Sequence, residues 1–477
     1  MPLYSHLDKI ETSVTIDDVA FVVDSGRAKE KNYDPHLKTS TLQPMWISQA
    51  SAKQRRGRAG RTKAGVCFHL FSRRRHASFR EFLESELIRT SLEEICLQCK
   101  KLDLTPGGPE DDDGIPSFLA AALTPPHPKS VSNALESLVE LGAMDVETNE
   151  LTRLGHCLSC LSVDPKVGKM IIWSYVLGCS KDASSMAVAM SYKSPFIIPP
   201  SHMRRDADQA KVEISQGTES DQVAVLKVLE ARDDFYKRGR QNQFFSYCRN
   251  NFINFATIQM ISDLRRNIAR ELASIGYPDP STPNTWHNRN ASGANLPFLQ
   301  ATIVAGVFPN VASRQEGAMN FSSETNRKSK IHISSVNACK GQPLSRKSQM
   351  LEFVAYNEMV KGTAMYTLSQ TTHLASVLPI LLLCGDFRVR PAYKYAAGEE
   401  KEETRHAVMS VDEWISFQCD KSIGSALAIL RKRLDAIFHI IVSNPKAGFD
   451  GLSQMERNTL SALDAVMKSS FLCTPGR

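Results

Sequence analysis

The sequence lacks an apolar run long enough to cross a membrane. Its longest apolar stretch, residues 377–384, has the length of one strand, whereas a membrane helix needs about 20 apolar residues. The first residues lack the basic flank and apolar core of a secretory signal. The 11 cysteines lack the regular spacing of a disulfide framework. We therefore expect reduced thiols and a location in the cytoplasm, the nucleus or the interior of an organelle.

Two motifs that a P-loop ATPase requires are also missing from the sequence. It contains no Gly-x-x-x-x-Gly-Lys-Ser/Thr loop and no Asp-Glu pair in the context that holds magnesium. The nearest candidates, Gly168-Lys169 and Asp412-Glu413, have the wrong spacing and context. We therefore expect that this chain alone does not hydrolyse ATP.

The length and charge set broad bounds on the protein. A chain of 477 residues with 42% hydrophobic residues is long enough for about three to five domains. The net charge of +7 favours polyanionic partners only mildly. The distribution of charge is more informative, because residues 53–75 contain many lysines and arginines and no acidic residue.

The basic segment contains a specific pattern, Gln-Arg-Arg-Gly-Arg-Ala-Gly-Arg at residues 54–61. Arginine binds phosphate oxygens through two hydrogen bonds and stays charged at physiological pH, so this density of arginines suits a polyphosphate. The two glycines allow a ligand to approach the backbone closely. The alternatives are a solvated basic run or a nuclear localisation patch.

The order of residues in this segment resembles motif VI of the DEAH/RHA group of superfamily 2 RNA helicases. Residues 11–19, Glu-Thr-Ser-Val-Thr-Ile-Asp-Asp-Val, resemble the later part of motif V of the same family, at the expected distance upstream. The resemblance covers nearly the whole chain and is strongest over residues 11–105. It implies the C-terminal half of an ATP-dependent helicase that moves 3′ to 5′ along RNA in its complete form.

The resemblance implies catalytic roles for three residues. In this family the last two arginines of motif VI reach the γ-phosphate of ATP on a neighbouring RecA-like domain, and here these are Arg58 and Arg61, with Gln54 near the attacking water. Such arginines stabilise the charge that develops as the phosphoryl group leaves. Asp17 and Gly57 correspond to family positions that lie beside the bound nucleotide. ATP and Mg²⁺ are thus implied for the complete enzyme, and neither is expected to bind stably to this chain alone.

A second group of residues is implied to contact RNA. Thr12 and Ser13 correspond to positions on the RNA backbone in the family. Residues 27–47 read as a hairpin, with turn residues near Asn32. The family places a hairpin here beside the nucleic acid, where Arg27 and Lys29 would touch phosphate, although exposed solubilising charge is the alternative.

The segments on both sides of this hairpin predict further elements of an α/β domain. Residues 19–26 are an apolar run ending in a turn signal, which predicts a buried strand, and residues 65–71 predict a closing strand. After these, Thr90 followed by Glu93 is typical of a helix N-terminus with a capping box. Two Cys-x-x-Cys pairs, at 96–99 and 157–160, raise the question of zinc. The first pair lies on the apolar face of a predicted helix, so we expect core cysteines and no metal site.

The second half of the chain changes from helical to alternating patterns. Residues 154–276 read as helices and resemble the ratchet domain of the family, with Ser220-Asp221-Gln222 where Ser-Asp-His is usual. Residues 277–295 predict a linker, and residues 330–335, 350–354, 364–370 and 377–384 predict strands of a small barrel. The family has an OB-fold here, a scaffold for single strands. His332 and Ser334 resemble positions of its His-Pro-Ser-Ser segment and are either phosphate contacts or buried strand residues.

The expected fold class is thus a multidomain α+β protein. Its expected parts are a partial second RecA-like α/β domain (1–88), a winged helix (89–153), a helical ratchet bundle (154–280), an OB-like β-barrel (281–397) and a C-terminal helical extension (398–477). The expected partners are RNA, single-stranded or duplex with an overhang, the absent N-terminal RecA-like domain and a G-patch-type activator. Two alternatives stay open: a noncatalytic RNA-binding scaffold, and an incomplete gene product.

Overall fold

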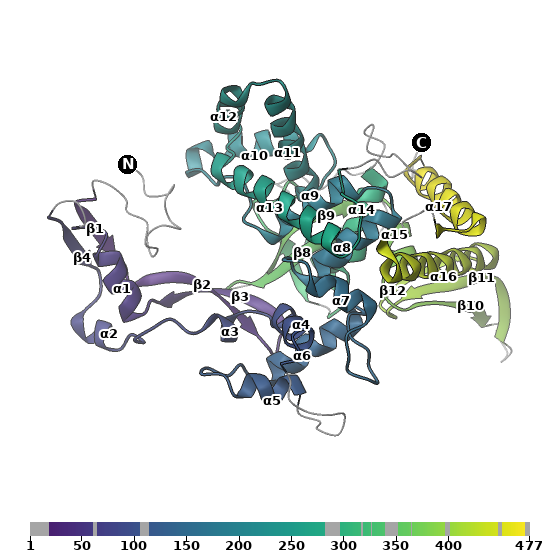
Figure 1. Cartoon of the computed structure of the whole chain (residues 1–477), viewed down its shortest axis with the longest axis horizontal. Helices are drawn as coiled ribbons and strands as arrows, with labels where there is room; N and C mark the ends of the chain where they lie inside the picture. Colours follow the sequence, from purple (N-terminus) through teal and green to yellow (C-terminus); the bar gives the residue numbers. More distant parts are fainter. Residues whose placement is uncertain are drawn as a thin grey trace. The chain divides into compact units, whose positions relative to one another are not determined.

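The computed structural model describes most of the chain in two compact units. The described residues are 19–60, 64–104, 114–281, 296–315, 318–325, 327–338, 352–363, 365–395, 401–446 and 451–472. The first unit is formed by residues 1–92, 105–134 and 360–364, and the second by residues 93–104, 135–359 and 365–477. We describe each unit by itself (Figure 1).

The first unit contains a small parallel sheet. Strand β1 (Phe21–Asp24) pairs with β4 (Val66–His69), so both strands expected around the arginine motif are present. The expectation that β1 is buried is wrong in the described residues, since Phe21 is 67% and Val23 is 66% exposed. Within the described residues β1 and β4 form a sheet of two strands, and one face of that sheet is exposed.

The predicted hairpin is confirmed. Strands β2 (Arg27–Asp34) and β3 (Thr39–Trp46) pair antiparallel along their whole length, from Arg27 with Trp46 to Asp34 with Thr39. The Asp34 carboxylate closes the turn by accepting hydrogen bonds from the amides of His36 and Leu37. Figure 1 shows the hairpin as a long twisted ribbon that leads into helix α1 (Gln49–Arg56).

After α1, the described part of the first unit contains three further short helices, and one sequence expectation fails among them. Helices α2 (Arg73–Ala77), α3 (Glu86–Arg89) and α5 (Gly114–Ala120) are each less than three turns long. Thr90 was expected to cap the N-terminus of the next helix. It lies instead at the C-terminus of α3, where its hydroxyl donates to the Glu86 carbonyl at 2.9 Å.

Helix α4 (Glu93–Lys101) belongs to the second unit and packs against α7 (Arg153–Ser159). Cys96 and Cys99 are buried on its inner face, as the apolar pattern indicates. Helix α6 (Pro128–Glu140) follows in the chain. In the region expected to form a winged helix (89–153), the described structure has one isolated antiparallel bridge, Met144 with Leu151.

The predicted helical region is confirmed as the centre of the second unit. Its remaining elements are α8 (Pro165–Val176), α9 (Ser180–Ser191), the short 3-10 helix η2 (Ser201–Met203), α10 (Arg204–Ser215), α11 (Asp221–Lys237), α12 (Gln241–Asn250) and α13 (Phe255–Ser274). Helix α14 (Leu296–Val307) packs on α8 at Gly306. The approach is so close that a Cβ at this position would overlap Met170. Most of the linker expected at 277–295 lies outside the described residues.

The predicted barrel is present and has five strands. They are β5 (Val311–Arg314), β6 (Phe321–Ser323), β7 (Lys328–Ile331), β8 (Glu352–Lys361) and β9 (Tyr366–Leu374), and β8 closes the barrel by pairing with both β5 and β9. The strand expected at 377–384 is wrong: this segment forms helix α15 (Leu378–Leu383), and five of its six residues are buried hydrophobic side chains or Pro379. A short apolar run does not distinguish a strand from a buried helix.

The C-terminal section combines a sheet with two long helices. Strands β10 (Phe387–Tyr395), β11 (Lys401–Val411) and β12 (Ile415–Asp420) form an antiparallel sheet. Helices α16 (Lys421–Ser443) and α17 (Gln454–Leu472) follow, and Figure 1 shows α16 crossing the sheet. The expectation of a purely helical section is therefore corrected, because β11 and β12 lie within it. Trp173 of α8 stacks on Phe438 of α16 with ring centroids 4.3 Å apart, and this contact joins the C-terminal section to the helical centre.

Candidate nucleotide and nucleic-acid interface

Helix α1 carries the first three residues of the arginine motif, Gln54, Arg55 and Arg56. Its N-terminus is capped by Ser48, whose hydroxyl accepts a hydrogen bond from the Ser51 amide at 3.0 Å. Lys53, Arg55 and Arg56 occupy its last turn, where cations are favoured by the helix dipole. Gly60, just beyond the helix, has a φ of +115° and open space at its Cβ position, so the chain turns there without a side chain in the way.

Arg55 is anchored inside the first unit. Its guanidinium donates to Asp24 Oδ1 at 3.1 Å and to the Arg27 carbonyl at 3.2 Å. Asp24, at the end of β1, is 3% exposed and also accepts from the Gly26 amide at 2.9 Å, and His69 Nδ1 lies 3.7 Å from Oδ2. Arg55 therefore holds the strand end and the base of the hairpin together. This role was not predicted from the sequence, although an aspartate that ends an apolar strand is a usable signal for it.

Only some of the residues predicted to contact the nucleotide lie in the described part of the chain. Gln54 and Gly57 are exposed on α1 and at its C-terminus, whereas the Arg58 side chain is buried, with 5% of the residue exposed. Asp17 and Arg61, like Thr12 and Ser13, lie outside the described residues. The structure thus places Gln54, Gly57 and Arg58 on one short segment.

The predicted hairpin contacts lie on the hairpin's first strand. Arg27 and Lys29 are exposed on β2, two positions apart, and so share one face of the strand. The Arg27 guanidinium lies 4.0 Å from the ring centroid of Trp46, its cross-strand partner. Arg27 therefore has a packing role as well as an exposed charge.

A buried polar network in the second unit holds the segment that contains His332 and Ser334. At its centre the Asp221 carboxylate accepts hydrogen bonds from the Lys211 ammonium at 2.6 Å, the Ser335 hydroxyl at 2.5 Å, the Val336 amide at 3.0 Å and the Thr371 amide at 2.9 Å. Lys211 also donates to the Ser334 carbonyl at 2.7 Å. Asp221 and Lys211 were not predicted as site residues, and they join helices α10 and α11 to the barrel.

His332 and Ser334 lie in the loop after β7 and not in a strand. Both are half-buried, and His332 Nδ1 lies 2.7 Å from the Ser334 hydroxyl. The His332 amide donates to the Leu368 carbonyl of β9 at 2.8 Å. The structure therefore brings the two predicted residues together on a loop whose backbone is fixed at both ends.

Gln222, which stands where the family usually has histidine, belongs to the same network. Its side-chain amide donates to the Gln370 carbonyl at 2.7 Å, and its oxygen accepts from the Thr372 hydroxyl at 2.6 Å. Gln222 and Thr372 are both buried. The residue therefore connects α11 to β9, which is a structural role.

One ion pair near this network affects a pKa. His373 Nδ1 lies 3.0 Å from Glu219 Oε2, and this hydrogen bond lowers the pKa of Glu219 below its ordinary value, against the opposing effect of burial. Elsewhere burial raises the pKa of the Cys96 thiol to about 12, so this cysteine is unreactive. Among the described residues no group of three or more His, Cys, Asp or Glu side chains is placed to hold a metal ion.

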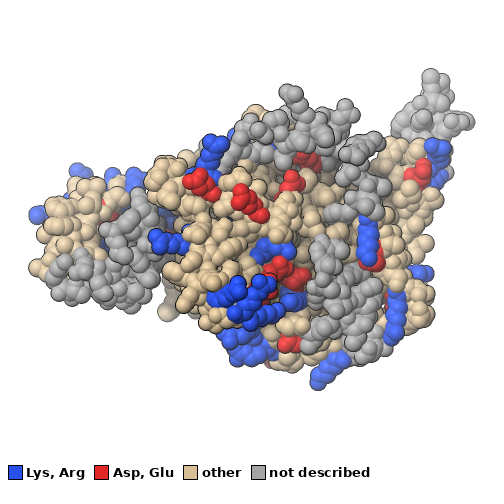
Figure 2. Space-filling model, turned by 90° about the horizontal axis from the view of Figure 1, so that it is seen from above, with Lys and Arg blue, Asp and Glu red and all other residues tan. Residues whose placement is uncertain are grey.

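Charges on the surface are mixed. On the face drawn in Figure 2, Lys and Arg side chains lie beside Asp and Glu side chains and do not form one continuous basic surface. In the part of the chain that the structure describes, no helix is both long and apolar enough to span a bilayer.

Comparisons with known proteins agree with this architecture. Residues 299–386 match the oligonucleotide/oligosaccharide-binding (OB)-fold family, and residues 164–244 match the ratchet-like helicase associated domain (HA2). The chain is 34% identical over 437 residues to the DExH-box ATP-dependent RNA helicase DExH1 of Arabidopsis thaliana, which covers 91% of this chain and 40% of that protein. The chain is a C-terminal DExH helicase region.

Two further relatives also match more than nine-tenths of this chain. The human ATP-dependent RNA helicase DHX29 is 31% identical over 452 residues, covering 92% of this chain and 31% of that protein. The mouse ATP-dependent DNA/RNA helicase DHX36 is 31% identical over 469 residues, covering 98% and 44%. The chain thus spans less than half the length of each of these relatives. The predicted family, the ratchet helices and the OB-fold are confirmed.

Proposed function

We propose that the chain is the RNA-binding C-terminal part of an ATP-dependent RNA helicase that unwinds RNA in the 3′ to 5′ direction. The observation that carries this proposal is the Asp221 network, which fixes the loop of His332 and Ser334 between the ratchet helices and the OB barrel. A barrel of this type binds single strands of nucleic acid on one face. A rigid junction allows movement of one part to be transmitted to RNA held by the other.

The RNA contacts in this proposal come from both units. Thr12, Ser13, Arg27 and Lys29 would bind the RNA backbone in the first unit, and His332 and Ser334 in the second. Contacts to phosphate position a strand without reading its sequence. The ligand is RNA that is single-stranded or has a single-stranded overhang.

The nucleotide contacts in this proposal require a partner domain. ATP and Mg²⁺ would be held by an N-terminal RecA-like domain, with Asp17 and Gly57 on the nucleotide side. Gln54 would orient the attacking water, and Arg58 and Arg61 would stabilise negative charge on the transferred phosphoryl group. Since this chain contains neither a phosphate-binding loop nor an Asp-Glu box, it is inactive alone. The activator of the complete helicase in this proposal is a G-patch-type protein.

The burial of Arg58 favours a second function. An arginine that is 5% exposed does not face an open cleft, as a residue reaching for ATP on another domain would. The second candidate is therefore a noncatalytic RNA-binding scaffold derived from such a helicase. It retains the RNA contacts and uses the arginine segment to stabilise the fold.

The test is an ATPase assay of the purified chain with and without RNA, together with RNA binding at increasing salt. We expect no hydrolysis above background and RNA binding that weakens steeply with salt, because cations that neutralise phosphates release counterions. Adding the N-terminal RecA-like domain of a relative should restore hydrolysis if the first function holds. In that mixture the rate of hydrolysis should fall when the chain carries Arg61→Ala. An equal rate for the wild type and Arg61→Ala would favour the noncatalytic scaffold.

A further inference from the structure

Strands β1 and β4 place a cysteine, a histidine and an aspartate side by side within the first unit. Cys67 and His69 are two positions apart on β4 and so share one face of the strand, and Asp24 on β1 is the cross-strand partner of His69. Cys67 Sγ lies 3.8 Å from His69 Nε2, and His69 Nδ1 lies 3.7 Å from Asp24 Oδ2. A nucleophile beside a base that a third group orients is the arrangement of activated thiols and hydroxyls.

The two carboxylate oxygens of Asp24 have different neighbours. Oδ1 accepts hydrogen bonds from the Arg55 guanidinium and the Gly26 amide. Oδ2 is buried and accepts no hydrogen bond from the described residues, and His69 Nδ1 faces it. An aspartate in this position favours the histidine tautomer that carries its proton on Nδ1. The other ring nitrogen, Nε2, is then unprotonated and lies beside the Cys67 sulfur.

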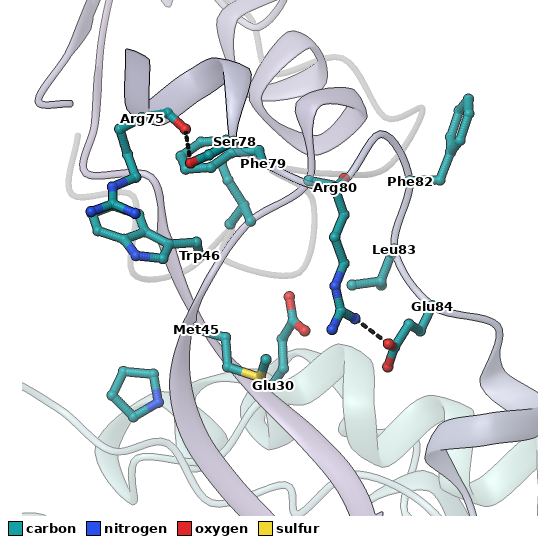
Figure 3. A pocket seen from close by; sticks show the side chains of 13 residues that line it. Glu30, Met45, Trp46, Arg75, Ser78, Phe79, Arg80, Phe82, Leu83 and Glu84 are labelled. Atoms are coloured by element: carbon teal, nitrogen blue, oxygen red, sulfur yellow. Dashed lines mark hydrogen bonds and ion pairs between the residues drawn. The ribbon is translucent and has the colours of Figure 1, made fainter. Parts of the chain in front are cut away.

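Aromatic packing holds the His69 ring in place. The ring lies against Phe71 with centroids 4.8 Å apart, and Phe71 lies against Phe79 with centroids 5.1 Å apart. Phe79 in turn stacks on Trp46 at 5.6 Å, and these two residues line a pocket of about 370 Å³ at the base of the hairpin (Figure 3). A continuous row of rings therefore supports His69, although part of its side chain is open to solvent.

The Cys67 thiol needs a base in order to react at neutral pH. Burial and the nearby Asp24 carboxylate raise the pKa of this thiol, and Arg56 opposes this rise in part. The group is therefore a thiol at neutral pH, whereas the thiolate is the nucleophile. His69 Nε2 is close enough to take the thiol proton. Cys67 is only half-buried, so a small reagent can reach its sulfur.

We propose that Cys67 is a modification site, which hydroperoxides oxidise to a sulfenic acid with His69 as the base. The sulfur attacks the outer oxygen of the hydroperoxide, so an S–O bond forms and the O–O bond breaks. His69 Nε2 takes the thiol proton and returns it to the leaving oxygen, which departs as water or an alcohol. The sulfur is oxidised and the hydroperoxide is reduced. Asp24 stabilises the imidazolium that exists between the two proton transfers.

The same chain contains a matched cysteine that lacks this arrangement. Cys419 of β12 is half-buried like Cys67, and the pKa of its thiol is also raised, chiefly by burial. The histidine on the neighbouring strand, His406, is the cross-strand partner of Asp420 and so lies on the opposite face of the sheet. A difference in reactivity between Cys67 and Cys419 therefore measures what the histidine beside Cys67 contributes.

The test treats the full chain with hydrogen peroxide, traps sulfenic acid with dimedone and follows the labelling of each cysteine peptide by mass spectrometry. We expect Cys67 to be labelled faster than Cys419 by about 100-fold at neutral pH, the lower end of the contribution of a positioned general base. His69→Ala should remove this difference, although it also opens access to Cys67. The matched control is His76→Ala, which removes another ring packed on Phe71 and should leave the Cys67 rate unchanged.

The pH dependence supplies a second measurement. In His69→Ala the Cys67 rate should rise with pH and approach that of the wild type at alkaline pH, because the thiol then ionises without a base. A deficit that persists there would contradict a base role for His69. Equal labelling of Cys67 and Cys419 in the wild type, or a Cys67 rate that His69→Ala leaves unchanged at neutral pH, would overturn the proposal. Matching circular dichroism melts of the variants exclude unfolding as the cause.

Discussion

The Lys211 ammonium lies 2.6 Å from Asp221 Oδ1, and both residues are at least nine-tenths buried. This ion pair crosses from α10 to α11, and the same carboxylate fixes the loop after β7 through Ser335 and Val336. It therefore connects the helicase-associated helices to the OB barrel, in addition to the contacts of Gln222 with β9. Removing the carboxylate leaves a buried ammonium with a single carbonyl partner, which is a costly arrangement.

Asp221→Ala is expected to destabilise the second unit by about 3–5 kcal/mol, because it leaves Lys211 as an unpaired buried charge. The measurement is urea denaturation followed by circular dichroism. The matched control is Asp263→Ala, which breaks an exposed pair with Arg266 and should cost about 1 kcal/mol or less. Equal losses for the two variants would show that the network does not hold the junction.

Arg55→Met is expected to destabilise the first unit by about 3 kcal/mol, since Asp24 is 3% exposed and loses its guanidinium partner. The exposed neighbour Arg56 supplies the control variant Arg56→Met, which should change stability by about 0.5 kcal/mol or less. The two thermal melts decide whether the motif contains a structural arginine. A melt of Arg55→Met that coincides with that of Arg56→Met would contradict this role.

Glu219 is expected to make stability depend on pH in the acid range. Its folded pKa lies below the ordinary value of 4.5 because His373 hydrogen-bonds to it. The stabilisation is therefore present above that ordinary value and is lost as the pH falls through the folded pKa. Melting temperatures of the wild type should fall more steeply below this value than those of Glu219→Gln. Parallel curves would exclude a contribution from this pair.

Lys29→Ala is expected to weaken RNA binding and to lower the salt dependence, with a change in the log–log slope of about 0.7 for one lost phosphate contact. Binding isotherms at several salt concentrations measure this slope. Lys29 is exposed, so stability should not change. Lys432→Ala, on the exposed face of α16, is the control and should leave the slope unchanged. A slope equal to that of the wild type would remove Lys29 from the RNA contacts.

Much of the architecture was predictable because its signals are local. The β2–β3 hairpin follows from alternating residues around Asp34, and the helices of the ratchet region follow from periodic apolar residues and capping groups such as Asp164 at α8. The family followed from the order of residues in the arginine motif and was confirmed by the relatives. Where one local pattern fits two structures, as at residues 378–383, the prediction failed.

The amino-acid sequence by itself determined the order of the elements, the family and the positions of the charged motif. Only the tertiary structure decided which charges are paired, because pairing joins residues far apart in the chain: the Thr371 amide that bonds to Asp221 is 150 positions away. It also decided that Arg58 is buried, that Gln222 connects α11 to β9 and that His69 lies between Cys67 and Asp24. Burial and hydrogen bonding depend on which segments meet in space, and no local pattern of residues specifies that.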